Sequence, residues 1–279
     1  MDWDKFILQA IEEDVREGDH TSLSCIPPKV VGTAQLLIKD NGILAGVELA
    51  EKIFHHLDSS LKFKKFLSDG AEIQKGQIAF ELSGNQRAIL SGERLVLNCL
   101  QRMSGIATLT HEYVTKVKDF KAKILDTRKT TPLFRTAEKW AVRIGGGENH
   151  RFGLFDMILI KDNHIDYAGG IVNAIVAAKK YLEEKKLSLQ VEIEARTLQD
   201  VELILKAGNV NRIMLDNFLL KDLQTAIKMI AERFETEASG GVSLETVRDI
   251  ASTGVDFISV GVLTHSYRSL DMSLKAKIS

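Results

Sequence analysis

The segment LQVEIEARTLQDVELILKAGNVNRIMLDN, residues 189–217, decides the fold. It begins with a short β-branched run, continues with a helical stripe of apolar residues and ends with a second apolar run. The helix is predicted over 197–207, because its first residue is a capping threonine and Gly208 can close its last turn. The two strands end at carboxylates, Glu194 and Asp216. A strand–helix–strand unit of this length predicts two neighbouring parallel strands.

The same alternation continues through the second half of the chain. Helical stripes at 221–234 and 243–252 separate further apolar runs, and the last four runs begin roughly every 22 residues. Polar and glycine residues follow the strands, as on the active-site face of a β/α barrel. We expect an incomplete (β/α) barrel, although an open doubly wound sheet would show the same periodicity. The six parallel strands are predicted at 122–125, 157–160, 189–193, 212–215, 235–238 and 257–260.

The first half of the chain has the texture of a small α+β domain, with glycine turns between short runs. Its longest helical pattern contains Ser104-Gly105, where we expect a break. The elements predicted there are helices over 3–11, 47–57 and 88–113 and strands over 31–38 and 78–82. We therefore expect an N-terminal α+β domain over 1–107, with 267–279 packing against it, and a catalytic barrel domain over 108–266.

The composition excludes several classes of protein. Of 279 residues, 44% are hydrophobic and 27% charged, and the net charge is −1, which argues against disorder and against a nucleic-acid-binding surface. Cys25 and Cys99 show no metal-ligand spacing. No apolar run is long enough for a membrane span, and the first residues do not resemble a signal peptide. We expect a cytoplasmic protein without nucleic-acid or membrane partners.

Cationic side chains gather after the predicted strands at 122–125 and 157–160 and in the segment between them. Arginine binds carboxylates and phosphates bidentately, whereas lysine acts as a point charge. Such a set predicts a polyanionic ligand. The cationic candidates are Arg128, Lys129, Arg151 and Lys161, with His150 and His164 nearby.

Glu194 and Asp216 form a candidate carboxylate pair, because they end consecutive strands. Such a pair can ligate Mg²⁺, hold ribose hydroxyls or balance developing positive charge, and it can equally form structural ion pairs. The turn Ser239-Gly240-Gly241 and the later Gly261 also follow strands, and exposed backbone N–H groups there can bind phosphate. A plain tight turn is the alternative. No GxGxxG or Walker A motif is present.

Longer motifs resemble those of one enzyme family, quinolinate phosphoribosyltransferase, also called nicotinate-nucleotide pyrophosphorylase (carboxylating). The resemblance spans nearly the whole chain. The motifs that carry it are GER with an asparagine at 92–98, SGIAT at 104–108, DTRKTTP at 126–132, GGGENHR at 145–151, LIKDNH at 159–164, VEIE at 191–194, LDNF at 215–218 and EASGG at 237–241.

The resemblance implies a homodimer with shared active sites and a Mg²⁺-dependent reaction in NAD biosynthesis. Quinolinate and phosphoribosyl pyrophosphate would give nicotinate mononucleotide, CO₂ and pyrophosphate. The family's catalytic roles transfer to Lys129, Lys161, Glu194 and Asp216, and the last two are also possible Mg²⁺ ligands, partly through the substrate. The substrate-binding residues it implies are Arg94 from the partner subunit, Arg128, Lys129, Thr130, His150, Arg151, Lys161, Glu194, Asp216, Ser239, Gly240, Gly241 and Gly261.

Within this set, Arg128, Arg151 and the partner subunit's Arg94 look like the clamp on the two quinolinate carboxylates. One departure follows the DTRKTTP motif at 126–132, where Leu133-Phe134 precedes an arginine and the family usually has a glycine. We expect a different local backbone there.

Three alternatives stay open. A molybdenum-transport-associated paralogue shares the fold and many of the motifs. Nicotinate phosphoribosyltransferase transfers the same group without decarboxylation, but its single-carboxylate substrate needs fewer arginines. A non-catalytic phosphate or nucleotide sensor on the same scaffold could dispense with the Glu194–Asp216 pair.

Overall fold

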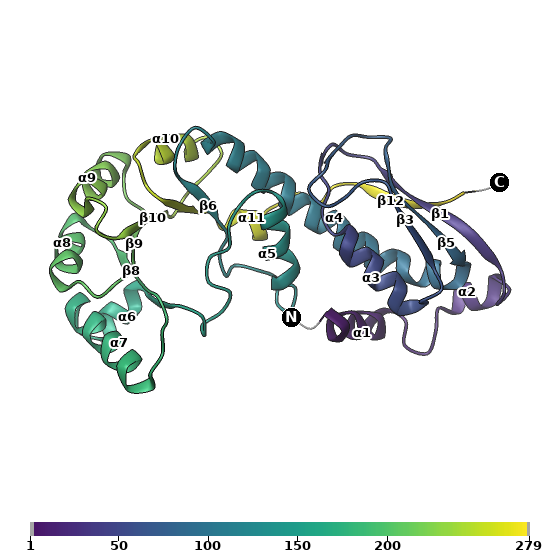
Figure 1. Ribbon diagram of the computed structural model, residues 1–279, viewed down its shortest axis with the longest axis horizontal. Coiled ribbons are helices and arrows are strands. Elements are labelled where there is room, and N and C mark those ends of the chain that lie inside the picture. Colours follow the sequence, from purple (N-terminus) through teal and green to yellow (C-terminus); the bar gives the residue numbers. More distant parts are fainter. Residues whose placement is uncertain (1–2, 278–279) are drawn as a thin grey trace. The chain divides into compact units, whose positions relative to one another are not determined.

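The computed structural model describes residues 3–277, which form two compact units (Figure 1). Unit 1 contains residues up to 111, residues 131–146 and residues from 266 onward, and unit 2 contains 112–130 and 147–265. Residues 1–2 and 278–279, at the ends of the expected N-terminal domain, lie outside the described residues.

Unit 1 is built on an antiparallel sheet of β1 (Val31–Ile38), β3 (Lys62–Lys65), β5 (Ile78–Asn85) and β12 (Met272–Ala276). The strand order is β12-β1-β5-β3, so the last strand of the chain pairs with the first. Figure 1 shows α3 (Val47–Leu57) and α4 (Gln86–Val117) on one face of this sheet. The other elements of unit 1 are α1 (Trp3–Asp14), α2 (His20–Cys25), β2 (Gly42–Ile43), β4 (Glu72–Ile73) and α5 (Arg135–Ile144).

Helix α4 runs unbroken through Ser104 and Gly105, so the predicted break was wrong. The Ser104 hydroxyl accepts a hydrogen bond from the Ala45 N–H at 2.9 Å, which ties the helix to the chain beside it. A Cβ on Gly105 would lie 2.3 Å from the carbonyl oxygen of Arg268. The glycine permits a close backbone approach and does not end the helix.

The segment 131–146, which the sequence assigned to the barrel domain, belongs to unit 1. Glu138 of α5 is fully buried and accepts a hydrogen bond at 2.7 Å from the Arg102 guanidinium on α4. The Phe134 ring lies 5.8 Å from the Phe6 ring of α1. These contacts draw the segment out of the strand–helix order, which sequence periodicity alone does not reveal.

The loop at Leu133 keeps a conformation that favours glycine. Leu133 has a φ of 63°, in the left-handed region, and its side chain is 83% exposed. The loop therefore places a leucine side chain on a backbone conformation that favours glycine.

Unit 2 contains six parallel strands: β6 (Lys123–Leu125), β7 (Ile158–Ile160), β8 (Val191–Ala195), β9 (Arg212–Asp216), β10 (Glu235–Ser239) and β11 (Phe257–Ser259). Their order is β6-β11-β10-β9-β8-β7. From β7 to β11 consecutive strands are neighbours, and β11 also pairs with β6. In a doubly wound sheet the order of the strands would reverse at a point in the middle of the sheet. The sheet is therefore a barrel opened at one seam, between β6 and β7, and the predicted fold class is confirmed.

Helices cover the outer side of this curved sheet, as α8 and α9 show clearly in Figure 1. Helix α8 begins at the predicted cap, where the Thr197 hydroxyl accepts a hydrogen bond from the Asp200 N–H. Helix α9 ends at Ile230, earlier than predicted, because Ala231 and Glu232 have φ values of 49° and 60°. The helices of unit 2 are α6 (Asp162–Tyr167), α7 (Ile171–Lys185), α8 (Leu198–Ala207), α9 (Leu220–Ile230), α10 (Val247–Ser252) and α11 (Val262–His265).

Among residues 3–277, no helix has the length and apolar character needed to cross a lipid bilayer.

Candidate active site

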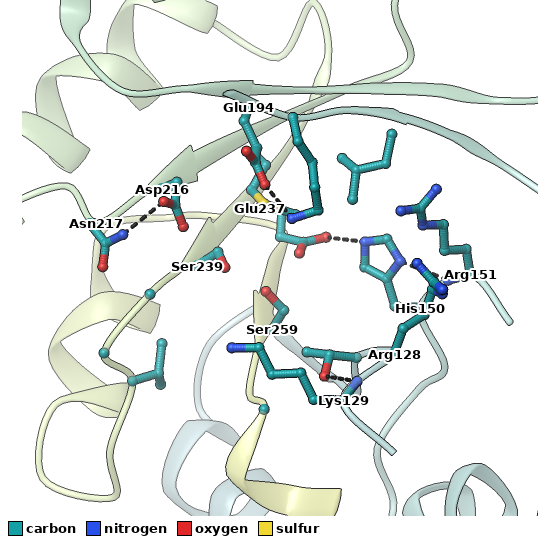
Figure 2. Close-up of a pocket in the computed structure, with 18 of the residues that line it drawn as sticks. Arg128, Lys129, His150, Arg151, Glu194, Asp216, Asn217, Glu237, Ser239 and Ser259 are labelled. Carbon is teal, nitrogen blue, oxygen red and sulfur yellow. Dashed lines mark hydrogen bonds and ion pairs between the residues drawn. The ribbon is translucent and has the colours of Figure 1, made fainter. Parts of the chain in front are cut away.

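A cavity of about 740 Å³ lies where the strands of unit 2 end (Figure 2). Its wall brings together side chains from all six strands or the loops after them, as expected for the carboxyl face of a barrel. Most of the residues that the sequence predicted for the site are in this wall. They are Arg128, Lys129, His150, Arg151, Lys161, Glu194, Asp216, Ser239, Gly240, Gly241 and Gly261.

Two predicted residues do not line the cavity. Thr130 lies beside it in the chain, with its hydroxyl 3.5 Å from the carbonyl oxygen of Arg128. Arg94 belongs to unit 1, where it lines a separate cavity of about 730 Å³ formed with α1 and the 131–134 loop.

Two guanidinium groups, those of Arg128 and Arg151, lie on the cationic side of the cavity. Arg151 is 9% exposed, and burial together with the charge of Arg128 lowers its pKa. The Nε of Arg128 is buried and has no hydrogen-bond acceptor among the described residues. Buried donors of this kind are normally paired. This side of the cavity is therefore arranged for an anion.

The segment at 147–151 is held in the open seam beside β6. Glu148 forms a parallel bridge with Leu125, and its N–H donates to the Ile124 carbonyl oxygen at 2.8 Å. The fully buried Asp126 carboxylate accepts the His150 N–H at 2.9 Å. These bonds place His150 and Arg151 inside the barrel, where a regular barrel would have another strand.

The carboxylate side of the cavity is formed by Glu194 and Asp216. Glu194 accepts a hydrogen bond from Lys161 Nζ at 2.7 Å and another from the Asp162 N–H at 3.0 Å. Asp216 accepts one from the Asn217 side chain at 2.7 Å. Burial and the neighbouring Glu194 charge raise the pKa of Asp216, which shows that the two carboxylates repel each other.

This donor set fits a Mg²⁺ ion held largely through substrate oxygens. The mutual repulsion of Glu194 and Asp216 would be relieved by a cation near them. Both Glu194 oxygens, however, already accept hydrogen bonds, one of them from the ammonium group of Lys161. The carboxylates therefore suit an ion that keeps water or substrate ligands, as Mg²⁺ prefers, better than a closed protein cage.

The glycine loops form the remaining wall. Gly240 has a φ of 92°, and a Cβ there would lie 2.1 Å from the Asn217 Oδ1, so only glycine fits. A Cβ on Gly261 would meet the Lys129 side chain at 3.2 Å. The helix expected from Ser243 begins only at Val247, so the loop backbone, and not a helix terminus, faces the cavity.

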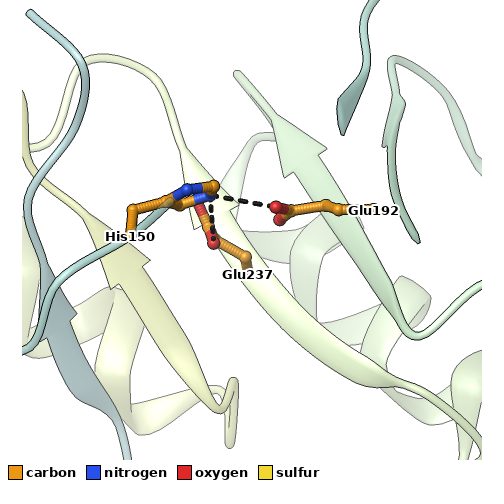
Figure 3. Close-up of side chains that lie close together, drawn as sticks. All are labelled: His150, Glu192 and Glu237. Atoms are coloured by element: carbon orange, nitrogen blue, oxygen red, sulfur yellow. Dashed lines mark ion pairs between the residues drawn. The ribbon is translucent and has the colours of Figure 1, made fainter. Parts of the chain in front are cut away.

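Beneath the cavity lies a buried cluster of His150, Glu192 and Glu237 (Figure 3). His150 Nε2 lies 2.9 Å from Glu192 and 3.4 Å from Glu237. The Arg212 guanidinium contacts Glu237 at 3.0 Å. Burial and the Glu237 charge raise the pKa of Glu192 to about 7.

The two carboxylates outweigh burial in their effect on the pKa of His150 and raise it. The Arg151 N–H opposes protonation of the second ring nitrogen. It donates to Nδ1 at 2.7 Å and therefore requires a lone pair there. The proton that the cluster retains on the imidazole is therefore the one on Nε2. The positions of His150, Glu192 and Glu237 would also suit a metal ion, since one ligand atom from each lies within 4.8 Å of the others.

Six polar residues that line the cavity were not among the predicted site residues: Thr127, Asp162, Asn217, Glu237, Ser259 and His265. Asn217 follows Asp216 directly and has a φ of 56°, a conformation that its sequence position does not reveal. Glu237 lies in the middle of β10, and Ser259 is the last residue of β11. A polar residue within a buried parallel strand was the available signal, because it must find a partner inside the barrel.

Several known proteins are similar to this chain over nearly its whole length. A catalogued nicotinate-nucleotide pyrophosphorylase (carboxylating) from Arabidopsis thaliana is 48% identical, covering 96% of this chain and 81% of that protein. A probable enzyme of the same name from Bacillus subtilis is 42% identical, with coverage of 96% and 91%. The crystal structure of NadC from Streptococcus pyogenes superposes with a TM-score of 0.92 at 38% identity, covering 98% of this chain and 95% of that one.

The family models divide the chain in two. Residues 19–104 match the N-terminal domain of quinolinate phosphoribosyl transferase and residues 106–275 match its C-terminal domain. The chain therefore belongs to the quinolinate phosphoribosyl transferase family.

Proposed function

We propose that this protein transfers the phosphoribosyl group of phosphoribosyl pyrophosphate to quinolinate with loss of CO₂, giving nicotinate mononucleotide and pyrophosphate. The cavity of unit 2 is the reaction site. The main structural support is the pair of neighbouring guanidinium groups of Arg128 and Arg151: Arg151 is 9% exposed, and Arg128 has a buried Nε without an acceptor among the described residues. A dicarboxylate supplies the bidentate acceptors that such groups need.

The opposite wall suits the sugar and its leaving group. Departure of pyrophosphate leaves positive charge on the ribose carbon, which Glu194 and Asp216 are placed to stabilise. Lys129 and Lys161 supply positive charge for pyrophosphate, and the loop at Gly240 offers backbone N–H groups for the 5′-phosphate. Mg²⁺ would neutralise further charge on the pyrophosphate.

Loss of CO₂ needs no organic cofactor from the protein. Once ribosylated, the ring nitrogen of quinolinate is cationic and stabilises the electron pair left on the adjacent carbon. The clamp of Arg128 and Arg151 would hold the carboxylates while the reaction proceeds. We infer a homodimer in which Arg94 from one subunit completes the site of the other, as the resemblance to the family implies. The cytoplasmic location stays a prediction, and the relatives include chloroplastic and mitochondrial proteins.

The direct test incubates the purified protein with quinolinate, phosphoribosyl pyrophosphate and MgCl₂ and measures nicotinate mononucleotide, CO₂ and pyrophosphate. We expect the three products in equal amounts. Replacing quinolinate with nicotinate separates this activity from transfer without decarboxylation, and product formation from nicotinate alone would contradict the proposal.

Site sharing is tested by mixing two inactive variants, Arg94→Ala and Lys161→Ala. In a mixed dimer one site would receive both defects and the other neither, because every contact of a two-fold dimer occurs twice. Random pairing of equal amounts should restore up to roughly one quarter of wild-type activity. Mixtures that exchange subunits, as shown by mass spectrometry of tagged chains, but stay inactive would place Arg94 at its own barrel.

A further inference from the structure

His150 occupies an unusual position between the buried cluster and the cavity. Its Nε2 faces Glu192 at 2.9 Å and Glu237 at 3.4 Å, and its Nδ1 accepts the Arg151 N–H at 2.7 Å. Both ring nitrogens are thus engaged with the protein, although the imidazole lines the cavity (Figures 2 and 3). A hydrogen bond from either nitrogen to a ligand would have to displace one of these contacts.

The cluster below His150 is anchored to three strands. Glu192 belongs to β8, Arg212 to β9 and Glu237 to β10. Arg212 donates to Glu237 at 3.0 Å, and its guanidinium lies 3.9 Å from the centre of the Phe257 ring on β11. These groups are almost completely buried, so their positions are fixed by the barrel itself.

Arg151, by contrast, lies in the irregular segment that occupies the open seam. Its guanidinium contacts the Met157 carbonyl oxygen at 3.2 Å, and its backbone N–H is held by His150. A binding group on irregular backbone needs such support, because a shift of about 1 Å can abolish its geometry. His150 is the link between this backbone and the rigid strands.

We propose that His150, Glu192 and Glu237 are positioning residues that hold Arg151 in place for the substrate carboxylate, and that His150 acts through Arg151 without binding the substrate itself. This inference rests on the proposed function for the identity of the substrate. Its structural part, the dependence of the Arg151 backbone on the His150 ring, does not.

A metal ion is a poorer occupant of the cluster. Arg212 already places a full positive charge at 3.0 Å from the Glu237 Oε2 that faces His150, and a cation there would be repelled. The guanidinium thus supplies positive charge to Glu237, and the imidazole Nε2 lies within ion-pair distance of both carboxylates.

The first test compares His150→Asn with His150→Ala. The asparagine Oδ1 can replace Nδ1 as the acceptor for the Arg151 N–H, whereas alanine offers none. We expect alanine to raise the KM for quinolinate about 10-fold or more, the asparagine variant to recover most of this loss, and the KM for phosphoribosyl pyrophosphate to stay unchanged in both. Equal losses in the two variants, or equal effects on both substrates, would overturn the proposal.

The second test asks whether His150 acts only through Arg151. His150→Ala should weaken quinolinate binding in the wild-type background and add nothing in an Arg151→Ala background, as calorimetry would measure. Additive losses would show an independent contact between His150 and the substrate.

A further pair of variants tests Glu192. Glu192→Leu should raise the quinolinate KM as His150→Ala does, while Glu192→Gln, which keeps an acceptor for Nε2–H, should restore it. If both variants match wild type, Glu192 has no positioning role.

A third measurement needs no substrate and so separates this inference from the proposed function. Hydrogen exchange of the Arg151 amide, followed by NMR, should be slow in wild type and in His150→Asn and fast in His150→Ala. Failure of the wild type to bind quinolinate would refute the function alone. An Arg151 amide that exchanges at the same rate in all three proteins would refute the inference alone. So would a metal analysis that finds one ion per chain in wild type and none in Glu192→Leu.

Discussion

Strand β8 carries two glutamates, two positions apart on the same inner face, that are both buried but have different partners. Glu192 is fully buried and faces His150, with Glu237 beside it. Glu194, one step nearer the cavity, pairs with Lys161, whose side chain is 47% exposed. The lower pair of carboxylates, Glu192 and Glu237, has fully buried side chains, and Glu237 also lines the cavity. The upper pair, Glu194 and Asp216, faces the cavity.

The difference shows how one strand can serve both stability and chemistry. A carboxylate without water depends on its protein partners, so removing one charge of the lower pair leaves others buried and uncompensated. A carboxylate at the cavity can be resolvated, and its charge is available to a substrate. We therefore expect changes in the lower pair to affect folding and substrate positioning, and changes in the upper pair to affect turnover.

The largest expected effect is on stability. Glu237→Ala removes the fully buried partner of Arg212 and leaves the half-exposed Glu235 paired with the guanidinium. It should lower the free energy of unfolding by about 3–5 kcal/mol. The matched change in the upper pair, Glu194→Ala, should cost about 1 kcal/mol or less, because Lys161 can turn to solvent. Urea unfolding of unit 2, followed by circular dichroism, measures both. Equal losses would remove the distinction between the pairs.

The next effect is on turnover. Asp216→Asn should lower kcat by roughly 10²–10³-fold and change its Mg²⁺ dependence, because the amide cannot stabilise positive charge on the ribose. The quinolinate Kd should stay nearly unchanged, since the clamp lies on the other wall. Glu202→Gln, at an exposed position of α8, is the control for loss of one negative charge. A variant with normal kcat at every Mg²⁺ concentration would make the upper pair structural.

The same two pairs show what the sequence could and could not predict. The upper pair was predictable, because carboxylates at the ends of parallel strands meet at one edge of the sheet. Strand existence was predictable from apolar runs, and all six strands of unit 2 are present. The lower pair was missed, because Glu192 and Glu237 lie within strands and their partners come from distant segments. Sequence spacing does not bring His150 to β8; the seam between β6 and β7 does.

The other failures have the same cause. The α4 helix continues through Gly105 because the Arg268 backbone packs there, a contact between residues far apart in the chain. Residues 131–146 belong to unit 1 because Glu138 finds a buried partner in Arg102. Local patterns predicted the elements. They did not predict which distant group each element meets.

The smallest expected effect concerns the two ion pairs that Arg212 forms. Arg212 contacts two glutamates at the same distance, 3.0 Å: Glu237, which is fully buried, and Glu235, whose side chain is 48% exposed. If burial and not distance decides the energy, Glu235→Gln should lower the free energy of unfolding by less than about 1 kcal/mol, because water can replace the lost charge. The amide also keeps an acceptor for the guanidinium. The measurement is urea unfolding of the Glu235→Gln and Glu237→Gln variants, each compared with wild type. A loss for Glu235→Gln as large as that for Glu237→Gln would mean that pairing geometry, and not enclosure, sets the cost of breaking these contacts.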